Sequence, residues 1–359
     1  MLLNRILSSD DGSSKALIAE DSDAQCDCAC ISDAHQGIPC PYPVYYYLEL
    51  TPSCNNLCPG CGNVFFGEGT RQHLPSPLPP AAWQDILLQL QPHARRLRIT
   101  GGEPTMHPEF ENIVLWIGEL GIPFVLFTNG RWQDADGLLA LLGKAPQFQG
   151  FLVSLHGATP KAHETFSGVS GSFQETVSNI QQAVSKEFSV SISTIITHQN
   201  YQQIAEIVQL ADTLGVSRVV FARYLGKEIP TISPADGELK IAIREIEAWR
   251  AKGAKVRFGN CIPQCFHPSS STGCLAGIAF CTIDPWGRIR PCNHSPLIVG
   301  DLLNDSVEEC WHSAKMRYWR ALVPEQCQSC AEFARCHGGC RAIAQQRGQD
   351  RDPLIQYHA

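Results

Sequence analysis

The sequence contains no run of about 18 apolar residues, so no segment is long enough to cross a membrane as a helix. Residues 1–7 turn polar too soon for a secretory signal peptide. Basic residues are also few: 28 Lys and Arg stand against 35 Asp and Glu, and the net charge of −7 excludes a general nucleic-acid-binding surface. We therefore expect a cytoplasmic protein that binds neither membranes nor nucleic acids.

Cysteine is missing from the middle of the chain and concentrated towards both ends. Seventeen cysteines occur in 359 residues; seven precede residue 62, ten follow residue 260, and none lies between. An odd number of cysteines without a signal peptide argues against a disulfide framework. The same density in a cytosolic chain is more typical of metal binding or catalysis. The distribution predicts a cytoplasmic, metal-rich protein.

Cys54, Cys58 and Cys61 follow a short strand-like run, residues 44–51. Iron–sulfur clusters are normally held by four cysteine thiolates. A loop with three thiolates can hold three irons of a cubane cluster and leave the fourth iron without a protein ligand. A structural zinc loop is the alternative, but it usually recruits a fourth Cys or His nearby, and the next histidine is His73. The spacing favours a cluster.

The middle of the chain alternates strand-like and helix-like segments, which predicts βαβ units and a parallel sheet covered by helices. Six such repeats fall short of the eight of a complete barrel, so we expect an open, partial barrel with its site at the carboxyl ends of the strands. The expected strands are 44–50, 97–100, 124–128, 151–155, 190–196 and 219–223, and the expected helices are 81–90, 109–120, 134–142, 172–185 and 201–214.

Two glycines and a carboxylate directly follow the second expected strand. Such glycines let the backbone approach a ligand closely, and a carboxylate can accept hydrogen bonds from an ammonium group. Together with the Cx3CxxC loop, this Gly-Gly-Glu-Pro run resembles the radical S-adenosylmethionine (radical SAM) superfamily. The resemblance implies that the free iron binds SAM and that SAM is split into methionine and a 5′-deoxyadenosyl radical. By position, the implied SAM contacts are Gly101, Gly102, Glu103, Pro104, Ser154, Thr194 and Arg223.

The C-terminal cysteines form a second pattern: a cysteine, twelve residues, Gly-x4-Cys, and then CxxCx5CxGGC. This pattern resembles the SPASM extension of radical SAM peptide-modifying enzymes, which holds two auxiliary clusters, expected to be 4Fe-4S. A zinc ribbon would explain the CxxC pair alone, and the longer run is more specific. By motif matching, the first auxiliary cluster is held by Cys274, Cys281, Cys292 and Cys340, and the second by Cys327, Cys330 and Cys336.

The second auxiliary cluster lacks a fourth cysteine in this pattern, because no cysteine follows Cys340. Three solutions remain open: a ligand other than cysteine, an open iron that binds substrate, or Cys310 folding back to the cluster. The non-cysteine candidates are Asp350, Asp352, His337 and His358.

Asn293 follows Cys292, where sulfatase-maturing relatives carry an Asp that serves as a base. An amide cannot accept a proton in that way, which argues against sulfatase maturation.

Besides Cys310, six cysteines lie outside both patterns. They are expected either to cap a cluster, to supply a thiol hydrogen donor, or to form a separate metal knot, the alternative being an extension with unused thiols. These residues are Cys26, Cys28, Cys30, Cys40, Cys261 and Cys265.

The expected domains are an N-terminal extension over 1–40, a radical SAM partial barrel over 41–230, a bridging helix within 231–260 and a SPASM domain over 261–359. The resemblance implies a precursor peptide as substrate, a flavodoxin- or ferredoxin-type reductant, and a leader-binding accessory protein as a further candidate partner. The tail is similar to that of Nif11-type maturases, which favours a splicease that excises tyramine and leaves an α-keto-β-amino acid. Alternatives are a peptide epimerase, a thioether or carbon–carbon crosslinking enzyme, and a non-catalytic electron-transfer or scaffold protein. The sequence assigns no catalytic residue.

Overall fold

The computed structural model describes residues 29–65, 74–268 and 273–356. Within them, the strands form a ten-stranded sheet in the order β10-β9-β8-β1-β2-β3-β4-β5-β6-β7. Neighbouring strands from β8 through β1 to β7 pair in parallel, whereas β9 and β10 extend the sheet in antiparallel pairs. The strand bounds are β1 Tyr45–Glu49, β2 Arg96–Thr100, β3 Phe124–Thr128, β4 Phe148–Ser154, β5 Val190–Ile196, β6 Arg218–Arg223, β7 Val256–Phe258, β8 Phe280–Ile283, β9 Arg288–Arg290 and β10 Gly300–Asp301.

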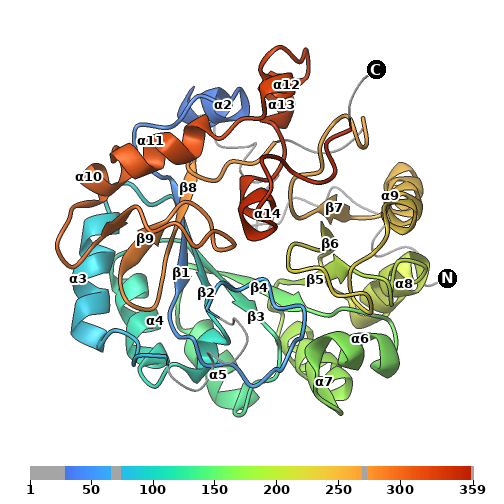
Figure 1. Ribbon diagram of the computed structural model, residues 1–359. Helices are drawn as coiled ribbons and strands as arrows, with labels where there is room; N and C mark the ends of the chain where they lie inside the picture. Colours follow the sequence, from blue (N-terminus) through green and yellow to red (C-terminus); the bar gives the residue numbers. More distant parts are fainter. Residues whose placement is uncertain (1–28, 66–73, 269–272, 357–359) are drawn as a thin grey trace.

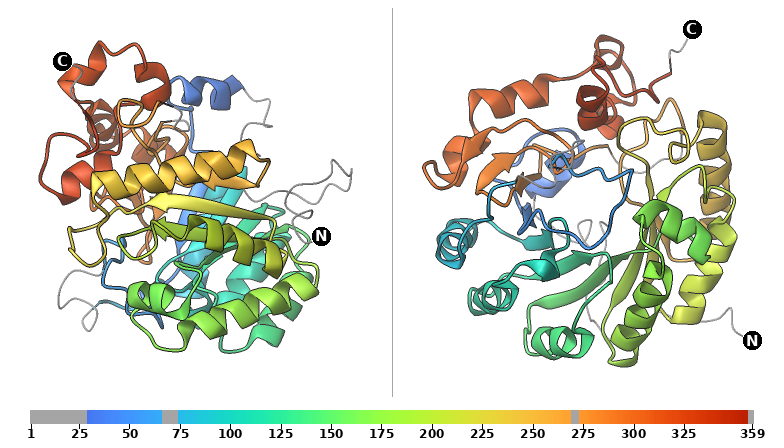
Figure 2. Two further views of the ribbon diagram at one scale, coloured as in Figure 1. Left: turned by 90° about the vertical axis from the view of Figure 1, so that its right-hand side faces the viewer. Right: turned by 60° about the horizontal axis from the view of Figure 1, so that its bottom comes forward.

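Helices connect most of the barrel strands and lie in an arc outside the curved sheet (Figure 1; right-hand view of Figure 2). This arrangement confirms the predicted α/β fold. The strands β3 and β5 cover the expected residues, and the helix α7 does too. The barrel helices are α3 Pro80–Leu90, α4 Phe110–Glu119, α5 Ala135–Gly143, α6 Pro160–Ser167, α7 Ser172–Ser185, α8 Ile204–Leu214 and α9 Asp236–Ala251, with a 3₁₀ turn η2 at Pro104–Met106.

The helix α6 was not expected from the sequence, yet local signals explain it. The Thr159 side chain accepts a hydrogen bond from the Ala162 backbone N–H, and Pro160 occupies the first helical position. Gly168 ends the helix with φ 71°, a left-handed conformation that glycine adopts without strain. The short loop from β4 to α6 thereby stays close to the carboxyl end of the sheet.

The predicted bridging segment 231–260 contains the helix α9 and also β7, which pairs with β6 as a seventh parallel barrel strand. The C-terminal segment 306–322 forms two short helices, separated by His312 and Ser313. Ser313 accepts a hydrogen bond from the Met316 N–H and thereby begins a new helix. The remaining helices are α2 Ala29–His35, α10 Val307–Trp311, α11 Ala314–Ala321, α12 Glu325–Gln328, α13 Phe333–Cys336 and α14 Arg341–Gln346.

The C-terminal region closes the open side of the barrel. Its strand β8 pairs with β1, so that Tyr45 lies opposite Phe280 and Leu48 opposite Ile283. The helix α14 lies over the space between the two sides of the barrel, and α2 packs beside the C-terminal helices (Figure 1). Among the described helices, none combines the length and the apolar character needed to cross a membrane.

Candidate functional site

The loop after β1 carries Cys54, Cys58 and Cys61 at the carboxyl end of the sheet. The Asn129 side-chain amide, on the loop after β3, donates to the Cys54 sulfur at 3.8 Å and to the Asn55 side-chain oxygen at 2.6 Å. Burial, opposed by a backbone hydrogen bond from Asn56, raises the pKa of the Cys54 thiol to about 11. Metal binding would deprotonate such a thiol.

Arg131 fastens the same loop from the other side. Its guanidinium donates to the Asn55 carbonyl at 2.6 Å and to the Asn56 side chain at 3.0 Å, while the Asn55 amide donates back to the Arg131 carbonyl at 2.8 Å. The segment Asn129–Arg131 therefore positions the cysteine loop. The sequence pattern does not single out Asn129; the pairing of β1, β2 and β3 brings the loop after β3 beside the cysteine loop.

Gly101 and Gly102 lie directly against the chain that leads into the cysteine loop. A Cβ on Gly101 would lie 2.6 Å from the Thr51 carbonyl oxygen, and one on Gly102 would lie 2.2 Å from that of Ser53. Gly101 also has φ 150°, which favours glycine. The glycines permit backbone hydrogen bonds from the Gly102 N–H to Thr51 and from the Glu103 N–H to Ser53, each 2.7 Å long.

The Glu103 carboxylate is fully buried and accepts four hydrogen bonds. The donors are the Thr105 hydroxyl and N–H, the Thr128 hydroxyl and the Asn129 N–H, at 2.7–3.3 Å. Burial raises the pKa of this carboxyl, and these hydrogen bonds oppose that shift. A carboxylate has about four acceptor positions. The Glu103 side chain thus joins the loops after β2 and β3, rather than offering an exposed oxygen to a ligand ammonium group.

The other expected SAM contacts differ in availability. Ser154 ends β4 and is half-buried. Thr194 is fully buried and donates to the Leu155 carbonyl at 2.6 Å, so its hydroxyl fastens β5 to the end of β4. His156 accepts from the Ile195 N–H at 3.2 Å, which makes it an anchor between the same two strands.

The C-terminal cysteines lie in two separate places. The first, here called the inner cysteine group, contains Cys261, Cys274, Cys292 and Cys340. The Cys261 thiol hydrogen-bonds to those of Cys274 and Cys340. Burial, followed by the charge of Cys340, raises the pKa of Cys292 to about 12.

Cys281 is not brought to this group, although motif matching assigned it there. It lies opposite Tyr46 in the β1–β8 pair, and its neighbour Thr282 lies opposite Arg290. Side chains alternate across a strand, so Cys281 and Arg290 lie on opposite faces of the sheet. Burial, then the nearby Cys310, raises the pKa of Cys281. The structure places Cys261 where sequence reasoning placed Cys281.

The second place, here called the outer cavity, contains Cys327, Cys330 and Cys336. These cysteines line a cavity of about 270 Å³ at the surface of the C-terminal region. Among the described residues, no three or more His, Cys, Asp or Glu side chains gather closely enough to hold one metal ion. Thiolates of a cubane cluster bind different irons and lie farther apart than the ligands of a single ion, so this absence concerns single-ion sites and not clusters.

Comparison with known proteins agrees with this geometry. Residues 48–211 match the model of the radical SAM superfamily, and residues 274–337 match that of SPASM, an iron–sulfur cluster-binding domain. The chain carries a radical SAM domain and a SPASM domain. It is therefore a radical SAM enzyme whose cofactors are SAM and iron–sulfur clusters.

Relatives of similar length extend the comparison over both domains. The AdoMet-dependent heme synthase of Methanosarcina barkeri is 27% identical over 82% of this chain and 90% of its own. The PqqA peptide cyclase of Gluconobacter oxydans is 27% identical over 86% of this chain and 87% of its own. Streptococcus suis SuiB, solved bound to precursor peptide SuiA, shares the fold with a TM-score of 0.75, 18% identity, and coverage of 98% of this chain and 84% of that one.

Arg223 was expected to contact SAM, but the structure commits its side chain to the C-terminal region. The guanidinium makes two hydrogen bonds to the Asp352 carboxylate, one of them 2.9 Å long, and the two side chains are 3% and 0% exposed. Asp352 also accepts from the Cys340 N–H at 2.8 Å. Arg223 therefore places a positive charge beside the inner cysteine group, where charge tunes a cluster's potential.

The loop after Cys61 is held by the SPASM domain. The ring of His294 hydrogen-bonds through Nδ1 to the Gly62 carbonyl at 3.0 Å. The guanidinium of Arg290 lies 4.9 Å from the Phe65 ring centroid and pairs with the buried carboxylate of Glu49 on β1. The two domains thus meet beside the radical SAM cysteine loop, and Glu49 is a partner of Arg290.

None of the described candidates for the missing ligand of the second auxiliary cluster lines the outer cavity. Asp352 is bound to Arg223, and the two ring nitrogens of His337 hydrogen-bond to carbonyls, including that of Cys274 at 3.2 Å. Cys310 lies with Cys281, and Asp350 is 85% exposed beside Arg351. His358 lies outside the described residues.

Cys30 and Cys40 belong neither to the inner cysteine group nor to the lining of the outer cavity. They belong to a small apolar cluster with Ile278 and Ala279, and the Cys40 thiol donates to the Cys30 carbonyl at 3.1 Å. They therefore help to fasten α2 to the SPASM domain. Cys26 and Cys28 lie outside the described residues.

Proposed function

We propose that the protein modifies a ribosomally made precursor peptide. The alignment with PqqA peptide cyclase carries this proposal, because it spans both domains and covers 86% of this chain and 87% of that enzyme. SuiB adds that the same arrangement of domains accommodates a precursor peptide in another protein.

When bound, the reduced cluster and SAM supply a radical that abstracts a hydrogen atom from the substrate. Residues of this chain would hold these groups: Cys54, Cys58 and Cys61 the first cluster, with Gly101–Pro104 and Ser154 beside it. Asn129 donates a hydrogen bond to the Cys54 sulfur, and such bonds to a ligand sulfur tune a cluster. The inner cysteine group, with Cys261 in the place expected of Cys281, would hold the first auxiliary cluster.

Within this class we propose excision of tyramine from a Tyr-Gly site. The run 285–294 and the segment 336–342 resemble those of Nif11-type maturases, and this resemblance supports the choice over epimerisation or crosslinking. Asn293 supplies no base beside Cys292; its backbone carbonyl accepts from Arg290 at 3.0 Å. This position therefore does not support oxidation of a Cys or Ser residue.

A precursor of heme is the second candidate substrate, because the AdoMet-dependent heme synthase aligns over a similar share of this chain at the same identity. The peptide is favoured by the fold shared with SuiB and by the likeness of the tail to peptide maturases. Testing both substrate classes with one preparation separates them.

The test uses anaerobic, cluster-loaded protein with SAM, a flavodoxin or ferredoxin reductant, and the precursor peptide encoded beside the gene, with and without a leader-binding partner. Release of 5′-deoxyadenosine together with loss of a tyramine unit supports the proposal. One deuterium gained from heavy water indicates epimerisation, and loss of two hydrogens indicates crosslinking. Absence of 5′-deoxyadenosine under all conditions contradicts the enzyme and favours a scaffold. We also propose a cytoplasmic location, since a protein dependent on reduced thiols suits that compartment.

A further inference from the structure

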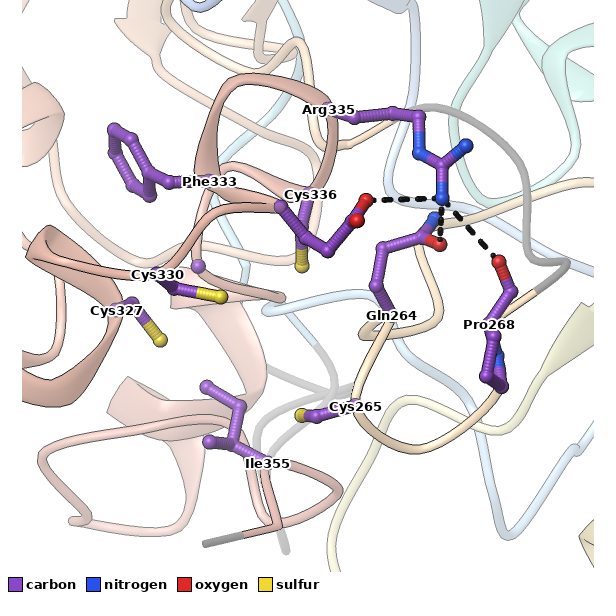
Figure 3. A pocket seen from close by; sticks show the side chains of 11 residues that line it. Gln264, Cys265, Pro268, Cys327, Cys330, Phe333, Arg335, Cys336 and Ile355 are labelled. Carbon is purple, nitrogen blue, oxygen red and sulfur yellow. Dashed lines mark hydrogen bonds and ion pairs between the residues drawn. The ribbon is translucent and has the colours of Figure 1, made fainter. Parts of the chain in front are cut away.

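A fourth cysteine lines the outer cavity. Cys265 lies on the turn that follows β7, far from the CxxCx5C run in sequence, yet it lines the same space as Cys327, Cys330 and Cys336. Figure 3 shows the four sulfur atoms directed towards one region, with Ile355 closing the cavity from below. The sequence analysis placed Cys265 among the cysteines outside the SPASM pattern, with capping of a cluster as one of its open roles, and did not name it for the missing ligand of the second auxiliary cluster.

The three later cysteines are fixed by two short helical turns. Cys327 lies in α12, and Cys336 ends α13. The Cys330 N–H donates to the Cys327 carbonyl at 3.2 Å, and the Cys336 N–H donates to the Glu332 carbonyl at 2.8 Å. These bonds hold the three thiols on one side of the cavity.

The turn that carries Cys265 is held against the opposite side. Arg335 donates to the Gln264 side-chain oxygen at 2.7 Å and to the Pro268 carbonyl at 3.4 Å, so it binds the turn on both sides of Cys265 (Figure 3). Glu332 pairs with the same guanidinium at 3.0 Å. The Gln356 N–H donates to the Cys265 sulfur at 3.4 Å.

We infer that Cys265 is the fourth thiolate of the second auxiliary cluster. Four cysteine thiolates are the ordinary ligand set of such clusters. Burial, followed by the charges of Cys336 and Cys330, raises the pKa of the Cys265 thiol, which agrees with their common place in the cavity lining. A metal cluster would compensate this concentration of negative charge.

The bend between the two tail sites explains how neighbouring cysteines serve different clusters. Residues His337, Gly338 and Gly339 have φ values of 58°, 75° and 75°, and a Cβ on Gly339 would lie 2.8 Å from Asp352. This left-handed run turns the chain, so Cys336 faces the outer cavity and Cys340 joins the inner group. Cys261 and Cys265 are also divided between the two sites: Cys261 belongs to the inner cysteine group and Cys265 lines the outer cavity. With Cys265 bound, the second cluster has no open iron, so substrate does not bind to it.

The test compares Cys265→Ala with Cys310→Ala, which also removes one cysteine but from outside both sites. Chemical analysis gives the iron and sulfide per chain of the anaerobically reconstituted proteins. Electron paramagnetic resonance spectra are recorded separately on the reduced proteins. Three four-iron clusters give about 12 irons per chain. The Cys310→Ala protein should match the wild type, whereas Cys265→Ala should contain up to about four irons fewer and lose or alter one spectral component.

Equal iron and identical spectra in the two variants would overturn the inference, as would loss of iron in Cys310→Ala alone. If Cys265→Ala does not fold by circular dichroism, Cys265→Ser decides. An oxygen ligand there should change the spectrum of one cluster, and an unchanged spectrum rejects the role of Cys265. These readouts need no turnover, so the inference can fail while the proposed peptide chemistry stands, and the reverse also holds.

Discussion

Replacing Cys261 with alanine should remove iron from the protein, whereas the same change at Cys281 should leave the iron content intact. The two residues differ in position and not in chemistry. Cys261 hydrogen-bonds to the thiols of Cys274 and Cys340, while Cys281 lies on the far face of β8 beside Cys310. This prediction separates the ligand set seen in the structure from the one that motif matching gives.

The expected magnitudes follow from the two environments. Loss of one ligand from a four-iron cluster should lower the total by up to about four of about 12 irons. Cys281 is 0% exposed and packs in the main core, so the alanine leaves a small void that costs on the order of 1 kcal/mol. Such a cost is too small to unfold a domain of ordinary stability.

The assay is iron and sulfide analysis of anaerobically reconstituted wild type, Cys261→Ala and Cys281→Ala, with spectra of the reduced proteins. Circular dichroism and thermal midpoints confirm that each variant is folded. The reasoning is refuted if Cys281→Ala loses iron while Cys261→Ala keeps the full amount. It is also refuted if both retain all three clusters.

Three further predictions concern buried polar groups. Glu103→Gln places an amide donor among the donors that now face a carboxylate, which should lower the free energy of unfolding by about 1–3 kcal/mol. It should also weaken SAM binding roughly tenfold or more, because about 1.4 kcal/mol corresponds to a factor of ten in affinity. Equilibrium dialysis measures the affinity, and an unchanged value would contradict the positioning role of Glu103. Arg223→Met leaves the buried Asp352 carboxylate without its counter-charge and should lower the free energy of unfolding by about 3–5 kcal/mol. The double variant Arg223→Met/Asp352→Leu should have a thermal midpoint between those of the wild type and Arg223→Met. A midpoint equal to that of Arg223→Met would refute the pairing. Burial lowers the pKa of His156 to about 3 and of His163 to about 4, so each is neutral when folded and would bind a proton near pH 6.5 when unfolded. The two neutral histidines therefore contribute their full share to the free energy of unfolding above pH 6.5, and this free energy should fall by up to about 1.4 kcal/mol per pH unit per histidine as the pH decreases towards 4. Urea unfolding between pH 7 and pH 5 measures the decrease. His163→Phe should reduce the slope of the unfolding free energy against pH by about half.

Much of the fold could be predicted because its signals are local. Alternating apolar patterns gave β3, β5 and α7 over the residues observed, and the Cx3CxxC loop falls after β1 as expected. The short strands β8, β9 and β10 were not found, because two to four residues in a cysteine-rich tail carry no readable period. The strand β8 depends on pairing with β1, more than two hundred residues earlier, and β9 and β10 extend the sheet from β8.

In the candidate site, too, features with local signals could be predicted and features that depend on distant residues could not. Gly101 and Gly102 were recognised because close backbone approach requires glycine. Thr194 and Arg223 have the right residue types at the right strand ends, yet each is committed to another partner that only the tertiary structure supplies. Cys265 was missed because motif matching follows chain order, whereas a cluster gathers thiols by distance.

The parallel pairing of β1 with β8 has a consequence for how the chain is made. Tyr45 meets Phe280, a residue 235 positions later, so during synthesis β1 has an unpaired edge until almost the whole protein has emerged. Edges of this kind invite pairing with other chains, and contacts between distant residues form slowly. The strand that bears the cysteine loop is thus the last of the barrel strands to be enclosed. Completion of the sheet beside the cysteine loop therefore depends on the SPASM segment, which covers the last open edge of β1.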